Sequence, residues 1–226
     1  MKKKATEVIA RAETDDGLLE LVRRADGAYL ILHGGRVLMN SAQNRSEVVL
    51  GELAARAVAD RTAPRVLVGG LGMGLTLRAV LAILPRRAEV LVAELNPVVV
   101  SWCEGPLAPL NGAALDDPRV RLQIGCVAAV LAAARAAGGT RRFDAVLFDL
   151  YEGPRTATQG ADDPLYGRAA IGAARGALCS DGVFAVWGEA PDAPFEARLK
   201  RAGFTVSRHR PGRGGHRHVV YLANLA

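Results

Sequence analysis

The sequence predicts an α/β protein in which a doubly wound, mostly parallel seven-stranded sheet follows a small N-terminal β region. Three observations support this class. From Pro64 onward short apolar runs alternate with segments of helical periodicity, a glycine-rich turn joins the first such pair, and no helix separates the last two apolar runs. Strands that alternate with helices form parallel sheets with helices on both faces. The last two strands must therefore form an antiparallel C-terminal hairpin.

The N-terminal region, residues 1–45, has a different pattern from the rest of the chain. Residues 18–40 contain short apolar runs separated by turn signals, which predicts two to four strands joined as hairpins. From Ser46 onward apolar residues recur at helical spacing, and Ser46 itself is a candidate helix N-cap. We therefore divide the chain into a β region, 1–45, and an α/β domain, 46–226.

The elements of the α/β domain follow one another after a boundary at Pro64. Strands are expected at 65–69, 89–94, 119–124, 144–149 and 183–187 and, in the hairpin, at 204–210 and 218–225. The helices between them are expected at 75–84, 97–103, 127–137, 165–179 and 194–202. Each helix assignment rests on apolar residues spaced three or four positions apart.

The turn after the first parallel strand is a candidate nucleotide site. Residues 65–78, RVLVGGLGMGLTLR, place Gly70, Gly72 and Gly74 in a G-x-G-x-G pattern between a strand and a helix. Dinucleotide folds use G-x-G-x-x-G, and Leu75 occupies the position of its third glycine, which disfavours NAD. Together with the antiparallel hairpin, the spacing resembles the Rossmann-like class I fold of S-adenosylmethionine-dependent transferases.

An acidic residue follows at the position expected for ribose binding. Glu94 ends the next strand, about 20 residues beyond Gly74, where a carboxylate accepts hydrogen bonds from both ribose hydroxyls. The helix N-terminus near Gly74 offers free N–H groups and a positive dipole end for a carboxylate. An adenosyl compound is therefore the expected ligand.

Further motifs extend this resemblance to a family. Four motifs are similar to those of the polyamine aminopropyltransferase (spermidine synthase) family, especially its short bacterial members. They are Gly-Leu-Gly-Met-Gly at 70–74, Glu94-Leu95-Asn-Pro, Asp-Asp-Pro-Arg-Val at 116–120, and Asp149-x-x-Glu152-Gly-Pro followed by Leu-Tyr at 165–166. The similarity runs from about Leu38 to Ala223. It implies that an amine attacks a carbon bonded to a sulfonium sulfur, with decarboxylated S-adenosylmethionine as donor and methylthioadenosine as by-product. It also implies a homodimer formed through the N-terminal strands.

The resemblance implies a role for each matching residue. The donor would be held by Gly70, Gly72, Met73, Gly74, Glu94, Leu95, Cys126 and Asp149. Asp149 would be the general base, Glu152 the anchor of a small amine acceptor, and Tyr151 a wall of the acceptor cavity. The chemistry of the residues agrees, because an ammonium must lose a proton before its nitrogen can attack, and carboxylates both bind the cation and accept that proton. Asp162, Asp163 and Glu189 are further acidic residues that add negative potential for a cationic acceptor.

Three features depart from the family pattern and leave alternatives open. Met73 stands where the family carries an Asp that contacts the donor's amine, and Cys126 stands where it carries an Asp for the adenine amino group; Gln43 is not at an obvious equivalent of the family's donor-binding glutamine. Met73 favours a methyltransferase that uses ordinary S-adenosylmethionine, because an Asp there would repel the donor's carboxylate. A non-catalytic binding or assembly module on the same fold is the second alternative.

Composition narrows the class of protein. The chain has 226 residues, of which 50% are apolar, and a formal net charge of +6. Its one dense basic stretch, 207–218, lacks the aromatic residues of a nucleic-acid surface, so we expect no nucleic-acid partner. The sequence shows no signal peptide and no membrane span, which predicts a cytoplasmic protein without a membrane partner. Its three cysteines are widely spaced, so we expect neither a metal site nor a disulfide framework.

Overall fold

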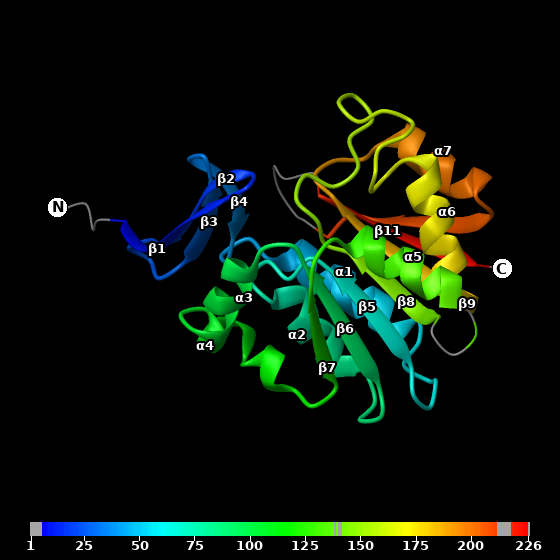
Figure 1. Ribbon diagram of the computed structural model, residues 1–226, viewed down its shortest axis with the longest axis horizontal. Coiled ribbons are helices and arrows are strands. Elements are labelled where there is room, and N and C mark those ends of the chain that lie inside the picture. The colour runs from blue at the N-terminus through cyan, green and yellow to red at the C-terminus, as the bar shows by residue number, and fades with distance from the viewer. Residues whose placement is uncertain (1–5, 138, 140–141, 212–217, 226) are drawn as a thin grey trace.

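The computed structural model describes residues 6–137, 139, 142–211 and 218–225. The chain forms two sheets, and Figure 1 shows the smaller one at the left of the view, beside the α/β body. Sheet A has four antiparallel strands in the order β1-β2-β3-β4, which are Glu7–Thr14, Gly17–Arg23, Tyr29–His33 and Arg36–Asn40.

Strand β1 is an element that the sequence patterns did not predict. It carries charged residues at Glu7, Arg11 and Glu13, so its apolar alternation is weak. Cross-strand ion pairs join it to β2, since Arg11 Nε lies 2.7 Å from a carboxylate oxygen of Glu20, and Glu7 pairs with Arg23 at the same distance. Pairing with a more apolar neighbour, and not its own pattern, makes this segment a strand.

Sheet B confirms the predicted fold class. It has seven strands in the order β10-β11-β9-β8-β5-β6-β7, in which β11 alone runs antiparallel to its neighbours. In chain order the strands are β5 Arg65–Gly69, β6 Glu89–Glu94, β7 Val120–Ile124, β8 Phe143–Phe148, β9 Leu178–Gly188, β10 Phe204–His209 and β11 Val219–Leu225. The chain winds outward from β5 to β7 and then returns to β8 on the other side. The carboxyl ends of β5 and β8 therefore flank the topological switch point, where open α/β sheets bind ligands.

Helices cover both faces of sheet B. The helices are α1 Arg45–Arg56, α2 Leu75–Ile83, α3 Pro97–Glu104, α4 Ala108–Asn111, α5 Val127–Ala137, α6 Arg168–Ala177 and α7 Ala193–Arg201, with a 3₁₀ turn, η1, at Ala114–Asp116. Along β5, Val66 and Val68 pack in one core with α1, α2 and α3, while Leu67 packs in the other with α5, α6 and α7. Leu19, Leu21 and Ile31 of sheet A belong to the first core.

The start of α1 differs from the prediction. The N-cap position is Asn44, and its side chain makes no capping hydrogen bond. Ser46 lies inside the helix, where its hydroxyl is 2.7 Å from Glu47 Oε2 and 2.9 Å from His218 Nδ1. Ser46 therefore joins α1 to the start of β11 instead of capping the helix.

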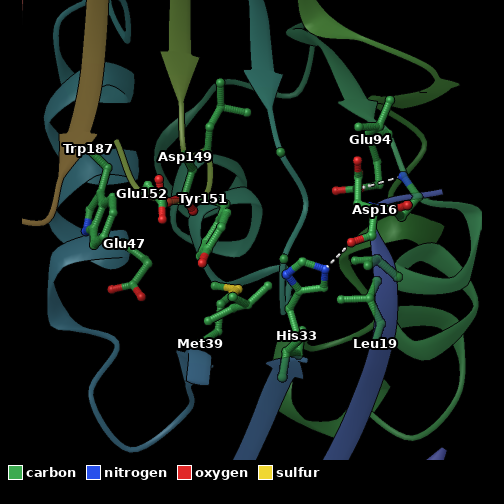
Figure 2. A pocket seen from close by; sticks show the side chains of 18 of the residues that line it. Asp16, Leu19, His33, Met39, Glu47, Glu94, Asp149, Tyr151, Glu152 and Trp187 are labelled. Atoms are coloured by element: carbon green, nitrogen blue, oxygen red, sulfur yellow. Dashed lines mark hydrogen bonds between the residues drawn. The ribbon is translucent and has the colours of Figure 1, made fainter. Parts of the chain in front are cut away.

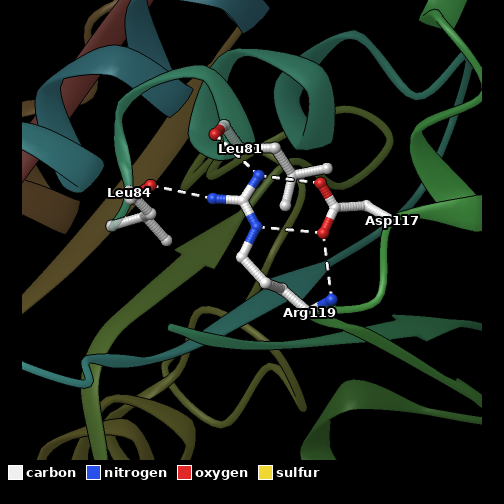
Figure 3. Close-up of polar contacts among 4 residues, drawn as sticks. All are labelled: Leu81, Leu84, Asp117 and Arg119. Carbon is white, nitrogen blue, oxygen red and sulfur yellow. Dashed lines mark hydrogen bonds and ion pairs between the residues drawn. The ribbon is translucent and has the colours of Figure 1, made fainter. Parts of the chain in front are cut away.

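The Asp-Asp-Pro-Arg-Val motif is a structural clasp, shown in Figure 3. Arg119 donates to the carbonyl oxygens of Leu81 and Leu84 at 2.9 and 2.8 Å, and its guanidinium pairs with Asp117 at 2.7 Å. The hydrogen bond from Arg119 holds the pKa of the Asp117 carboxyl below its ordinary value. The last carbonyls of α2 thus find partners, and the clasp fixes the approach to β7.

The remaining sequence expectations concern the surface. No helix in the described part of the chain is long and apolar enough to cross a bilayer. Of the basic stretch 207–218, the segment 212–217 lies outside the described residues.

Candidate active site at the strand ends

A cavity of about 1020 Å³ lies between sheet A and the carboxyl ends of β5, β6 and β8. Figure 2 shows Glu94 on one side of it and Glu47 and Trp187 on the other, with Asp149, Tyr151 and Met39 between. We call the two parts the Glu94 side, which comprises Gly70, Gly72, Glu94, Leu95 and Cys126, and the Asp149 side, which comprises Glu47, Asp149, Tyr151, Glu152 and Trp187.

The glycine turn forms the base of the Glu94 side. Gly70 has φ +87°, and a Cβ there would lie 2.3 Å from the carbonyl oxygen of Asp149. Gly72 has φ +52°, and a Cβ there would lie 2.5 Å from the sulfur of Met39. Both left-handed conformations favour glycine, and at Gly70 the approach to the Asp149 backbone leaves no room for a side chain. The turn therefore brings its backbone up to the cavity and against β8.

The carboxylate of Glu94 is held in a fixed orientation. The residue is 7% exposed, and its two oxygens accept hydrogen bonds from the backbone N–H groups of Leu71 and Asn96, at 2.8 and 2.9 Å. A carboxylate has about four lone-pair sites, so both oxygens keep acceptor capacity toward the cavity. A pair of neighbouring hydroxyl groups, as in a ribose, is the ligand that this arrangement suits.

Apolar side chains border the same side. Leu95 is 55% exposed although it is a large apolar residue, and Cys126 is also exposed. Both line the cavity, where they offer surface for a flat heteroaromatic ring. The Glu94 side thus fits a nucleoside by its hydroxyl acceptors and by its uncovered apolar surface.

Asp149 lies directly after β8, where the sequence predicted it. Thr76 of α2 donates to its Oδ2 at 2.6 Å and also lies 3.2 Å from the backbone oxygen of Glu47. Burial, followed by the negative charge of Glu47, raises the pKa of Asp149 from its ordinary 3.8 to about 7. A carboxylate with such a pKa is suited to accept a proton near neutral pH.

Glu152 and Tyr151 lie where the loop after β8 meets sheet A. Glu152 has a left-handed φ of +67°, which is rare for a residue with a side chain. Its carboxylate lies 3.1 Å from Arg36 Nη1, and the Arg36 guanidinium lies 5.7 Å from the centre of the Tyr151 ring. Arg36 belongs to β4, so this ion pair connects the two sheets across the cavity mouth.

Some of the predicted site residues do not line the cavity. Met73 is 0% exposed and packs in the core with α2 and α3, so its thioether does not face the donor space that the family resemblance implied. Gly74 is the N-cap of α2, and a Cβ there would lie 2.9 Å from the side chain of Asn111. Asp163 accepts hydrogen bonds from backbone N–H groups of its own loop, and Asp162 is exposed beside Arg168.

The structure also brings in residues that sequence reasoning did not select. Glu47, Trp187 and His218 line the Asp149 side, and Met39 and His33 of sheet A also line the cavity. Gln43 and Glu189, which sequence reasoning did consider, line it as well. An acidic residue in the first turn of a helix is ordinary, so nothing local distinguished Glu47. Within the described residues, no group of three or more His, Cys, Asp or Glu side chains is arranged to hold a metal ion.

Known structures share this architecture. A spermidine synthase in complex with the transition-state analogue AdoDATO superimposes with a TM-score of 0.74 at 19% identity, over 97% of this chain and 72% of that one. This fold resembles that of spermidine synthase. The enzyme from Thermotoga maritima gives a TM-score of 0.71 at 19% identity, over 97% and 73% of the two chains. Human methyltransferase-like protein 13, solved with SAH, gives 0.58 at 18% identity, over 81% of each chain.

Comparisons of the sequence with family models and with curated proteins find no match. The resemblance therefore rests on the fold, and the spermidine synthase structures cover sheet A as well as sheet B, since they span nearly the whole chain. The methyltransferase covers less of it.

Proposed function

We propose that this protein is a transferase that moves an alkyl group of the aminopropyl type from an adenosyl sulfonium donor to a small amine. One observation supports the proposal most directly. Glu94 at the end of β6 and Asp149 after β8 line a single cavity on either side of β5, the first suited to a ribose and the second to an ammonium. The similar spermidine synthase structure was solved with a transition-state analogue, which supports a donor of this class.

In this proposal, different residues of the chain bind the donor and activate the acceptor. The donor supplies an electrophilic carbon bonded to a positively charged sulfur. Glu94 and the glycine turn orient its nucleoside, so that the reacting carbon lies toward Asp149. Asp149 takes the proton from the acceptor's ammonium, the freed nitrogen forms the new C–N bond, and the C–S bond breaks to leave a neutral thioether.

The walls of the cavity assist by limiting water. Met39 of β4 packs against Gly72, and Tyr151, Leu165 and Trp187 add further surface on the Asp149 side. A drier site strengthens the attraction between Asp149 and an ammonium. Sheet A thus completes a site whose charged groups come mainly from the α/β domain.

A ligand-binding panel tests the proposal. Methylthioadenosine should stabilise the protein by about 2.7 kcal/mol at a hundredfold excess over its dissociation constant. For a chain of this size that is a rise in melting temperature of several degrees, at about 2–4 °C per kcal/mol. NAD is the control and should produce no shift. If adenosyl compounds also produced none, the non-catalytic alternative would be the better account.

Methyl transfer is the second candidate, and the position of Met73 favours it. With Met73 in the core, the glycine turn presents no carboxylate side chain at position 73 to repel the carboxylate of ordinary S-adenosylmethionine. The two transfers leave different thioethers, methylthioadenosine or S-adenosylhomocysteine. Calorimetric affinities for these two compounds therefore compare the candidates, and tighter binding of S-adenosylhomocysteine would favour methyl transfer.

A further inference from the structure

The buried end of the Asp149 side carries negative charge that the described residues leave without a cationic partner. Glu47 is 7% exposed, and its negative charge helps to raise the pKa of Asp149. Among the described residues, no Lys or Arg side chain forms an ion pair with either carboxylate, and Glu47 receives a hydrogen bond from the Ser46 hydroxyl. His218 reaches the same corner through Ser46. Glu47 is buried and Asp149 is partly buried, and two such carboxylates side by side are costly unless a cation joins them.

The opposite end of the Asp149 side is already neutralised. Arg36 pairs with Glu152 and lies over the ring of Tyr151. The Arg36 side chain is 55% exposed, and Nη1 is the one of its nitrogens that contacts Glu152, so the guanidinium keeps further donors toward the cavity mouth. Glu152 is thus part of a neutral ion pair in this structure and is not a free anion.

The other acidic residues of the cavity do not restore a second anionic end. Glu189 lies 3.8 Å from Arg155, and Glu94 belongs to the nucleoside side. Asp16 is exposed at the mouth, where its backbone oxygen contacts His33 at 2.6 Å. The cavity therefore has one inner anionic end, at Glu47 and Asp149, and a more exposed end, where Arg36 pairs with Glu152 and the carboxylate of Asp16 is exposed to solvent.

We propose that Arg36 is a specificity-determining residue that makes the acceptor a monoamine. The acceptor's single ammonium binds between Asp149 and Glu47, and its other end, which is uncharged or anionic, lies beside Arg36. A second ammonium would meet the guanidinium at close range and would have to displace it from Glu152. This inference rests on the proposed function and names the class of its acceptor.

Three amines of equal chain length test the inference: butylamine, 4-aminobutanoate and 1,4-diaminobutane. Each has four carbons and one amine at the near end, and the far end is a neutral methyl group, a carboxylate or a second ammonium. Binding is measured by calorimetry with methylthioadenosine saturating and at about pH 8, where histidine side chains are mainly neutral and the amines stay protonated. The variants are Arg36→Ala, which frees Glu152, and Arg36→Lys, which keeps the charge.

The wild-type protein should bind butylamine and 4-aminobutanoate about fivefold more tightly than the diamine, the upper range for a partly exposed charge pair. Arg36→Ala should move the preference toward the diamine by a similar factor, and Arg36→Lys should retain the wild-type order. Melting curves of the variants check that the fold is intact.

Three results would overturn the inference while leaving the proposed function standing. They are a wild-type preference for the diamine, an unchanged ratio in Arg36→Ala, and failure of all three amines to bind while methylthioadenosine binds. Absence of methylthioadenosine binding would instead overturn the proposed function, and the acceptor assignment with it.

Discussion

The two sides of the cavity are built in different ways. The Glu94 side is made of consecutive strand ends. Backbone N–H groups orient the Glu94 carboxylate there, and glycines allow the turn to approach the cavity. The Asp149 side is made of side chains from α1, the loop after β8 and β9, which lie far apart in the sequence, and Arg36 of β4 pairs with its Glu152. A short motif is therefore enough to form a nucleoside site. The specificity of an acceptor site, in contrast, can be altered by substituting single residues on separate elements.

The largest expected effect is on the Asp149 side. Asp149→Asn keeps the size of the side chain but removes the base, so turnover with an amine acceptor should fall by about 10²–10⁴. Affinity for methylthioadenosine should stay within about threefold of wild type, because the nucleoside is held on the Glu94 side. Asp162→Asn makes the same chemical change outside the cavity and serves as the control. Full turnover in Asp149→Asn would mean that this carboxylate is not the base.

The raised pKa of Asp149 predicts a pH dependence of stability without ligand. Because its pKa is higher in the folded state, about 7 against 3.8, the folded protein binds the proton more tightly. The resulting stabilisation is fully present below about pH 4 and is lost as the pH rises through 7, by up to about 4 kcal/mol. Urea unfolding at pH 5 and pH 8 should show the part of this loss that falls between pH 5 and pH 7, roughly 2.7 kcal/mol, in wild type relative to Asp149→Asn. Equal pH slopes in the two proteins would mean that Asp149 is not buried beside a second charge.

Glu94→Ala tests the other side. The substitution removes the acceptor of two charge-assisted hydrogen bonds to the ribose, each worth about 1.5–3 kcal/mol. Methylthioadenosine should therefore bind at least about tenfold more weakly by calorimetry, while amine binding changes little. Unchanged nucleoside affinity would show that Glu94 only orders the backbone at Leu71 and Asn96.

The difference between the two sides of the cavity explains which site residues the sequence could predict. Gly70, Gly72 and Glu94 lie in short motifs on successive strands, and the parallel topology brings such strand ends together wherever the rest of the chain goes. Glu47 and Arg36 had no such signal, because their roles depend on how sheet A and α1 pack over the loop after β8. The ion pair of Arg36 with Glu152 joins residues 116 positions apart.

Met73 shows the limit of reasoning from a motif. Its place between Gly72 and Gly74 predicted contact with a donor, but its flexible apolar side chain packs in the core instead. Strand β1 was not predicted, because its polar and charged residues leave no clear alternation of apolar side chains. Its cross-strand ion pairs with β2 are visible only in the structure. Six strands of sheet B were predicted to within one residue at each end, because their apolar runs alternate with regular helices. The exception is β9, which begins at Leu178 and not at 183, in a segment that was predicted as the end of helix 165–179.

The smallest expected effect belongs to Met73. Met73→Leu nearly conserves volume in the core, so the free energy of unfolding should change by less than about 1.5 kcal/mol. Affinity for methylthioadenosine should not change measurably. A loss of affinity beyond about threefold, with normal stability, would place the Met73 side chain at the donor after all and would weaken the division between core and cavity drawn here.

The central claim is alkyl transfer from a sulfonium donor to an amine in this cavity, and the nucleoside that remains after reaction tests it most directly. The protein is incubated with decarboxylated S-adenosylmethionine and a mixture of small monoamines and diamines, and mass spectrometry follows the adenosyl species. We predict methylthioadenosine together with an amine lengthened by one aminopropyl group, and loss of both products in Asp149→Asn. An intact donor under these conditions, with S-adenosylhomocysteine formed when ordinary S-adenosylmethionine is supplied instead, would contradict the account and establish methyl transfer.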